Sequence, residues 1–186
     1  KKAIETGKIG NVLGVHASLP WYRTDEYYSG PHGSWKGTWS LDGGGSLMNQ
    51  GIHTVDLAIF LGGPVDSVAG FHGVYGHTIE AEDHTVAILR YANGAIGTLY
   101  TTTCCQPDSQ QRMTIMGAKG SFSKFGDKLE WCALTNKKEQ ERLLSLFGAN
   151  SSSNQDGISK DPMAVSADGH MLIIEDLVKA IRADRE

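Results

Sequence analysis

The sequence predicts an α+β domain in which an open, largely antiparallel β-sheet is covered by helices on one face. Three observations favour this fold. Segments of strand-like alternation are gathered in the middle of the chain, helical patterns lie before and after them, and short turns join the strands. The 186 residues suffice for one sizeable core, so we expect residues 1–186 to form a single domain.

The N-terminal part is predicted to contain a helix end, a strand and a long loop. Residues 1–6 have the pattern of the last turns of a helix, with Gly7 as the C-terminal cap. Gly10–Trp21 is expected to be the first strand. Trp21–Trp39 is predicted to be irregular, with aromatic residues between basic ones, and a loop of this length in a compact domain usually has a function.

A glycine-rich stretch, Asp42–Gly45, then leads into a helix that we expect over Ser46–Leu61. Apolar residues wrap most of its circumference, so the helix is expected to be largely buried. Asn49, His53 and Asp56 lie at i, i+4 and i+7 and therefore share one face. Such a row of polar side chains either forms a satisfied network in the core or lines an active-site cleft.

The breaker Gly62-Gly63-Pro64 ends this helix, and the pattern changes to strands. Strands are expected at Val65–Val74, Asp83–Tyr91, Ala95–Thr102, Arg112–Met116, Ser121–Phe125 and Lys128–Cys132. Asn93-Gly94 favours a tight hairpin. Both alternating sets of side chains on Ala95–Thr102 are fairly apolar, which predicts a half-apolar outer sheet face covered by a partner, most simply another copy of the chain.

The C-terminal part is predicted to be helical, with a polar stretch in the middle. A short helix is expected at Lys138–Leu146, followed by an insertion or mobile loop up to Pro162. Asp168 is suited to cap a last helix, in which apolar residues recur at helical spacing. Because the first helix has no N-cap and the last has no stop signal, we interpret the chain as a fragment of a longer protein.

Composition excludes several classes of function. The net charge of −4, with mixed signs, provides no basic surface for nucleic acid or an anionic membrane. No apolar run approaches the ~18 residues of a membrane span. The three cysteines form neither a disulfide framework nor a spaced metal motif, which favours the reducing cytoplasm. We expect Cys104 and Cys105 to be ordinary strand residues.

A metal site is the next possibility, because the sequence has several histidines. His53 and Asp56 lie at i, i+3 on the predicted helix. The histidines downstream, His72, His77 and His84, fall in strands or turns without the spacing of metal ligands. The sequence therefore predicts no metal site.

Three motifs follow one another in a specific order. They are Trp35-Lys36-Gly37-Thr38-Trp39, then Asp42-Gly43-Gly44-Gly45, then Asn49-Gln50-Gly51-Ile52-His53 with Asp56. This series resembles the Gfo/Idh/MocA oxidoreductases, the glucose–fructose oxidoreductase and inositol dehydrogenase family. The likeness continues through Gly62–Val65, Glu82-Asp83 and Asn93–Gly97 to the last helix. Within the family, the residues of the first and third motifs are most similar to those of members that act on nucleotide-linked or acidic sugars.

The resemblance implies a two-domain dehydrogenase. An N-terminal Rossmann domain would bind NAD or NADP and carry a catalytic lysine, and an α+β C-terminal domain would shape the sugar pocket and oligomerise through its sheet. This chain resembles the second domain alone, since it has no Gly-x-Gly-x-x-Gly fingerprint after a strand. The substrate implied is a sugar, nucleotide sugar or cyclitol. The fragment by itself is expected to be inactive.

His53 matches the family's catalytic histidine, and Asn49 stands where many members have an aspartate bonded to that histidine. An imidazole is suited to remove a hydroxyl proton at neutral pH, and Asn49 would fix the orientation of its ring. A non-catalytic binding or assembly protein that kept the fold is the alternative.

Substrate contacts are expected from the long loop, through Tyr22, Arg23, Lys36 and Thr38. The alternative is that Trp35 and Trp39 only pack this loop against the domain. The glycines of Asp42–Gly45 either hold a substrate phosphate at the helix N-terminus or serve close packing and a sharp turn.

Overall fold

The computed structural model describes residues 1–148 and 168–183. The chain divides into two compact units, Lys1–Ser153 and Asn154–Glu186. The second unit contains helix α5 (Asp168–Arg182), which begins at the residue expected to cap it. No helix among the residues described is long and apolar enough to cross a membrane.

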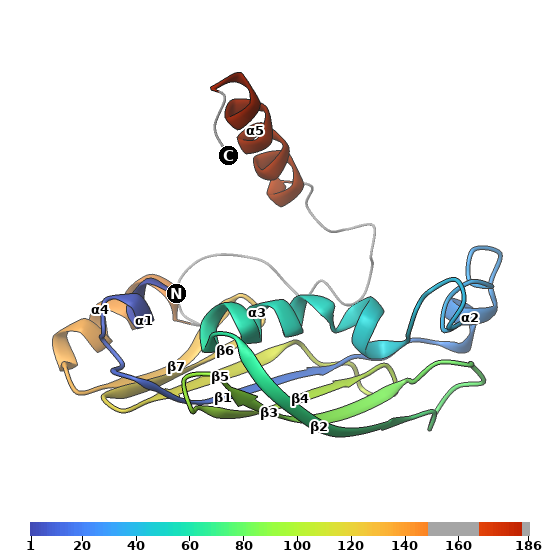
Figure 1. The fold of residues 1–186 in the computed structure, drawn as a ribbon, viewed down its shortest axis with the longest axis horizontal. Helices are drawn as coiled ribbons and strands as arrows, with labels where there is room; N and C mark the ends of the chain where they lie inside the picture. Colours follow the sequence, from blue (N-terminus) through green and yellow to red (C-terminus); the bar gives the residue numbers. More distant parts are fainter. Residues whose placement is uncertain (149–167, 184–186) are drawn as a thin grey trace. The chain divides into compact units, whose positions relative to one another are not determined.

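The first unit is built on a seven-stranded sheet with the order β2-β3-β4-β1-β5-β6-β7 (Figure 1). The strands are β1 (Val12–Pro20), β2 (Val65–Gly73), β3 (His84–Tyr91), β4 (Ile96–Thr102), β5 (Arg112–Gly117), β6 (Gly120–Phe125) and β7 (Lys128–Leu134). All neighbouring strands run antiparallel except β1 and β4, which are parallel. The predicted open, largely antiparallel sheet is confirmed.

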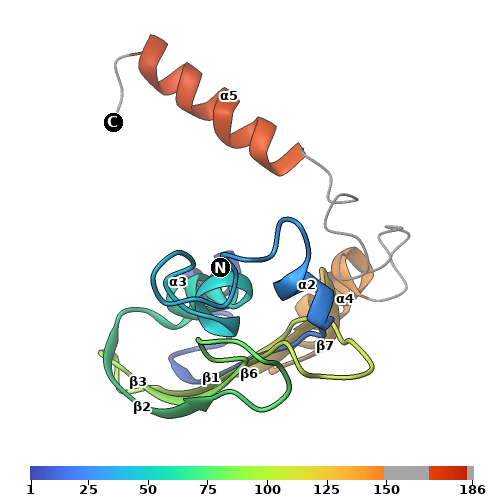
Figure 2. The same ribbon diagram turned by 90° about the vertical axis from the view of Figure 1, so that its right-hand side faces the viewer.

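Helices α1 (Lys2–Glu5), α3 (Ile52–Gly62) and α4 (Lys137–Phe147) all lie on one face of this sheet (Figures 1 and 2). Helix α3 packs on β1 and β5, and α4 packs on β7. The core lies between the layers, where Val15, Met113 and Ile115 are fully buried. The predicted placement of the helices on one face is therefore confirmed for this unit.

The outer face of the sheet exposes apolar side chains, as predicted. On β3 and β4 they alternate with buried ones, which is the two-residue period of a strand. The exposed fractions are 85% for Phe71, 60% for Ile88 and 61% for Ile96. Phe71 pairs with Val86, and Ile88 pairs with Ala69, so exposed apolar side chains adjoin one another across β2 and β3. On β4 the partner of Ile88 is Thr98, and Ile96 pairs with Arg90.

The prediction that the helix over Ser46–Leu61 is largely buried is wrong. It consists of a π-helical turn, Ser46–Gln50, followed by α3. Thr54 and Ala58 are buried against the sheet, whereas Ile59 and Phe60 are 42% and 53% exposed. A helix lying on a sheet buries only the side that faces the strands, whatever the hydrophobicity of its other side.

The remaining differences from the predicted secondary structure are small. The segment predicted to be irregular contains a short helix, α2 (Asp25–Ser29). Helix α4 begins one residue earlier than expected, where the Asn136 side chain accepts a hydrogen bond from the Glu139 N–H. Gly94 has a φ of 86° in the β3–β4 turn, as the hairpin motif predicts. The insertion predicted up to Pro162 lies mostly outside the described residues.

Candidate functional site

His53 lies in the first turn of α3, on the side that is exposed. Asp56 is exposed on the same helix. Within residues 1–148 and 168–183, the His53 side chain has no hydrogen-bond partner. Both ring nitrogens are therefore accessible to a molecule bound over this side of α3.

Asn49 does not contact His53 in the way that the sequence predicts. Its Nδ2 donates to Asp42 Oδ1 at 2.8 Å, and its Oδ1 accepts from Gln50 Nε2 at 3.2 Å. The expected hydrogen bond to the histidine is thus replaced by bonds to the preceding loop. The π-helical turn explains the difference, because the i, i+4 relation of an α-helix does not hold across its junction with α3.

Tyr27 joins the long loop to this helix and was not among the predicted site residues. Its hydroxyl accepts a hydrogen bond of 3.0 Å from Gln50 Nε2. The Lys36 Nζ lies 3.6 Å from the centre of its ring, and the Arg23 guanidinium carbon lies 5.3 Å from it. One aromatic ring therefore holds two predicted substrate-binding cations next to the segment that precedes His53.

The charges of Arg23 and Lys36 are not neutralised by an ion pair in the described part of the chain. Arg23 Nη1 donates to the Tyr22 carbonyl, while its Nε is buried without a hydrogen-bond partner. Burial, and then the charge of Arg23, lower the pKa of Lys36. Two cations that destabilise each other in a partly buried place favour the binding of an anion between or beside them.

The other residues predicted in this loop have different contacts. The Tyr22 N–H donates to Asp108 Oδ1, and Tyr22 forms an isolated bridge with Cys104. The Thr38 hydroxyl donates to the Trp35 carbonyl and accepts from the Leu41 N–H, so it stabilises the turn. The tryptophans of the loop are half-exposed, 42% at Trp35 and 50% at Trp39.

The glycine-rich stretch serves close packing. The Glu82 carboxylate accepts from the N–H groups of Gly45 and Leu47 at 2.8 and 2.7 Å. A Cβ on Gly45 would lie 1.7 Å from the Glu82 carbonyl oxygen, so only glycine fits there. Because a carboxylate already occupies these N–H groups, they are not open to a substrate phosphate.

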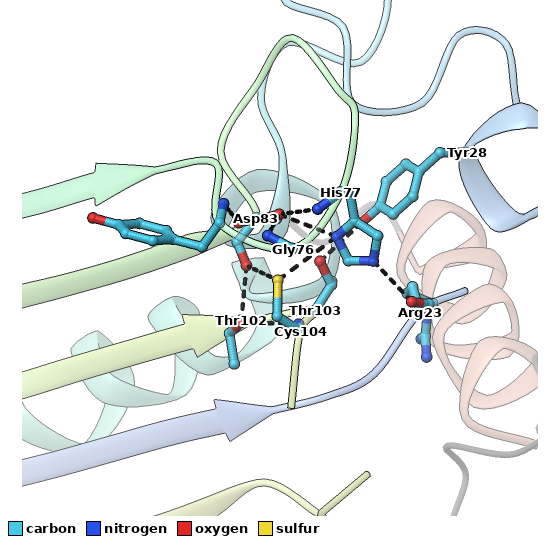
Figure 3. A network of polar contacts seen from close by, with 9 residues as sticks. Arg23, Tyr28, Gly76, His77, Asp83, Thr102, Thr103 and Cys104 are labelled. Atoms are coloured by element: carbon cyan, nitrogen blue, oxygen red, sulfur yellow. Dashed lines mark hydrogen bonds and ion pairs between the residues drawn. The ribbon is translucent and has the colours of Figure 1, made fainter. Parts of the chain in front are cut away.

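A second polar cluster joins His77, Asp83 and Cys104, which the sequence did not bring together (Figure 3). His77 Nδ1 lies 3.1 Å from Asp83 Oδ2 and 3.6 Å from Cys104 Sγ. Cys104 lies beyond the end of β4, so it is not the ordinary strand residue that we expected. The three residues are up to 27 positions apart, and only the return of the chain at the ends of β3 and β4 makes them neighbours.

The Asp83 carboxylate is fully buried and well satisfied. It accepts hydrogen bonds from the N–H groups of Tyr75, Gly76 and His77 at 2.8–3.0 Å. Burial by itself raises the pKa of Asp83, but these bonds outweigh it and lower the pKa below its ordinary value. Burial and the neighbouring carboxylate raise the pKa of the Cys104 thiol to about 11.

Comparison with known proteins places this geometry in a family. The model of the GFO/IDH/MocA C-terminal domain matches residues 1–123. The uncharacterized oxidoreductase C115.03 of Schizosaccharomyces pombe is 32% identical over 132 residues, which are 68% of this chain and 34% of that protein. The uncharacterized oxidoreductase YhhX of Escherichia coli is 30% identical over 126 residues, 68% of this chain and 33% of that protein. The chain thus spans about a third of these relatives.

Solved structures of dehydrogenases have a similar fold. The WlbA dehydrogenase from Bordetella pertussis, in complex with NADH and UDP-GlcNAcA, has a TM-score of 0.69 at 37% identity, over 73% of this chain and 43% of that one. The levoglucosan dehydrogenase in complex with NADH and levoglucosan has a TM-score of 0.65, over 74% of this chain and 39% of that one; at 24% identity it supports the fold alone. This chain belongs to the Gfo/Idh/MocA family of oxidoreductases, within the C-terminal domain of that family.

Proposed function

We propose that this chain is the substrate-binding domain of an NAD(P)-dependent dehydrogenase that acts on a hydroxyl group of a sugar-like molecule. The cofactor, NAD or NADP, would be bound mainly by an N-terminal domain outside the 186 residues. The observation that carries the proposal is the exposed His53, which has no hydrogen-bond partner among the described residues and lies on the helix that the Arg23–Lys36 loop adjoins. It is supported by family membership and by similar dehydrogenases, 37% and 30% identical, whose structures contain NADH.

His53 would act as the acid/base. When the substrate is oxidised, its C–H bond is lost as hydride and its O–H bond as a proton, and a carbonyl forms. The nicotinamide supplies the hydride acceptor. A neutral His53 nitrogen at hydrogen-bond distance from the hydroxyl would take the proton, and in the reverse reaction it would return it. Its exposed position on α3 leaves it accessible to both substrate and cofactor.

The substrate that the site fits best carries a negative charge, as in an acidic sugar or a nucleotide sugar. Neither Arg23 nor Lys36 forms a salt bridge in the described structure, although the Asp42 carboxylate is close enough to Lys36 to raise its pKa against the stronger effects of burial and Arg23. The WlbA dehydrogenases from Bordetella pertussis and Chromobacterium violaceum, 37% and 30% identical, were both solved with UDP-GlcNAcA. A guanidinium and an ammonium group on one ring are suited to a carboxylate or phosphate.

Turnover of an acidic sugar should therefore depend on Lys36. In the full-length protein, Lys36→Met is expected to raise KM for an acidic substrate on the order of 10-fold, the loss of one charged hydrogen bond, with a smaller effect on neutral sugars. NADH formation with NAD⁺ and a panel of sugars, inositols and nucleotide sugars measures this. Lys138→Met, on the exposed side of α4, is the matched control. An equal effect on neutral and acidic sugars would contradict the anion-binding role.

We also propose that the protein forms a homo-oligomer through the outer sheet face, in a reducing compartment such as the cytoplasm. The described cysteines are free, and the exposed apolar side chains of β2–β4 are suited to an isologous contact. Phe71→Asp is expected to lower the mass measured by light scattering towards that of a monomer. Leu41→Asp, at an exposed loop residue elsewhere, should leave it unchanged. A monomeric parent protein would refute this proposal.

The alternative is a binding or assembly protein without catalysis, which the large apolar sheet face favours. The same assays separate the two. Turnover of any substrate of the panel with NAD⁺ or NADP⁺ establishes the enzyme. Absence of cofactor binding in the full-length protein, together with oligomerisation, would favour the assembly protein.

A further inference from the structure

The cluster of His77, Asp83 and Cys104 has no part in the proposed hydride transfer. It combines one nitrogen, one oxygen and one sulfur ligand atom, all within 4.8 Å of one another. Four ligands at ~2.0–2.3 Å around a tetrahedral zinc lie roughly 3.3–3.8 Å apart. The distances of His77 Nδ1 to Asp83 Oδ2 and to Cys104 Sγ, 3.1 and 3.6 Å, are close to that geometry.

The ring of His77 is oriented as that of a metal ligand. Its Nε2 lies 2.8 Å from the Arg23 carbonyl oxygen. A carbonyl only accepts, so Nε2 carries the hydrogen and Nδ1 is the atom that faces Asp83 and Cys104 (Figure 3). Histidines that bind metals are commonly fixed in this way by a backbone carbonyl on the other nitrogen. The Tyr28 ring also packs against the His77 ring, and the two ring centroids are 4.8 Å apart.

The carboxylate is fixed as well. Three backbone N–H groups hold the fully buried Asp83 side chain in one orientation. The place beside the sulfur is kept open by Gly76, since a Cβ there would lie 2.7 Å from Cys104 Sγ.

A cavity of about 500 Å³ gives access to the sulfur. Cys104 lines it together with Phe71, His72, Tyr75, His84 and Val86. Its size allows water to reach the cluster as a fourth ligand.

We propose that His77 Nδ1, Asp83 Oδ2 and Cys104 Sγ bind one zinc ion, with water as the fourth ligand. This set of nitrogen, oxygen and sulfur suits zinc, whereas Mg²⁺ and Ca²⁺ prefer oxygen ligands alone. On binding, a zinc–sulfur bond forms and the thiol proton passes to the solvent, with no change of oxidation state. The ion would join the β2–β3 connection, the segment after β4 and the loop at Arg23. The inference does not depend on the proposed dehydrogenase activity.

The competing interpretation is a metal-free pair of imidazolium and carboxylate, in which Nδ1 also carries a hydrogen and donates to Asp83. The two can be distinguished by spectroscopy. The untagged chain, treated with EDTA and dialysed, is titrated with Co²⁺ and separately with Zn²⁺. We expect one equivalent of zinc by mass spectrometry of the metal content, and a near-ultraviolet thiolate-to-cobalt charge-transfer band.

The adjacent cysteines provide a matched pair of variants. Cys104→Ser should abolish the charge-transfer band and lower zinc affinity by roughly 10- to 100-fold or more, whereas Cys105→Ser should change neither. Alkylation of the wild-type chain tests the same contact without a variant, because zinc should protect Cys104 and not Cys105. Fewer than 0.1 equivalents of zinc, on the order of background, would refute the site. A band that persists in Cys104→Ser, or an equal alkylation of Cys104 with and without zinc, would refute it too.

Discussion

Replacing His53 by alanine is expected to lower kcat/KM of the full-length enzyme by at least ~10²-fold, because the hydroxyl proton would lose its acceptor as the hydride leaves. Such a loss corresponds to about 2.7 kcal/mol of transition-state stabilisation. The fold should not change, since His53 is exposed and has no hydrogen-bond partner among the described residues. The initial rate of NADH formation, on the substrate identified in the panel, measures the effect.

His32→Ala is the control for this experiment, since His32 is also exposed but lies in the long loop. It should keep wild-type turnover. If His53→Ala retains full turnover while NAD⁺ still binds, the proton acceptor is another group, such as the lysine that the family resemblance places on the other domain. The dehydrogenase would then stand and the role of His53 would not.

Asp83→Ala is expected to destabilise the first unit by about 3–5 kcal/mol in metal-free buffer, because each buried donor left without an acceptor costs about 1–3 kcal/mol. The N–H groups of Tyr75, Gly76 and His77 would lose their acceptor in a fully buried place. Urea denaturation followed by circular dichroism measures the change. Asp66→Ala, at an exposed position on β2, should shift stability by no more than ~0.5 kcal/mol. Equal effects of the two variants would show that the cluster contributes no stability.

The sign of the pH dependence follows from the same contacts. Since the pKa of Asp83 is lowered in the folded state, its carboxylate stabilises the fold at pH values above its unfolded pKa. This contribution is lost as the pH falls through the folded-state pKa. As the pH is lowered, the free energy of unfolding of the wild type should therefore approach that of Asp83→Ala.

Local patterns were enough to predict most of the sheet. The alternation in β3 and β4, and the Asn93-Gly94 turn between them, depend on neighbouring residues only. The same holds for the start of α5 at Asp168. The burial of α3 was not predictable in this way, because an apolar side chain such as Phe60 is buried only if another layer covers it.

Only part of the site could be predicted from the sequence, because some of its residues are neighbours only in the folded chain. His53, Arg23 and Lys36 lie in motifs of residues close together in sequence. Tyr27 became part of the site through contacts with Lys36 and Gln50, nine and 23 positions away. The cluster of Asp83 and Cys104 likewise depends on the register of β3 with β4, in which His84 pairs with Thr102. Spacing along the chain contains no signal for such contacts.

The position of β1 in the sheet has a consequence for the order of folding. Strands β2, β3 and β4 follow one another in space as in sequence, and so do β5, β6 and β7. Each set is closed by short connections and can form early, because nearby segments meet fastest. Strand β1 lies between the two sets, parallel to β4, which begins more than 70 residues later. Because β1 precedes both sets in sequence, it is synthesised before either, and we expect it to join them into one sheet only after they have formed.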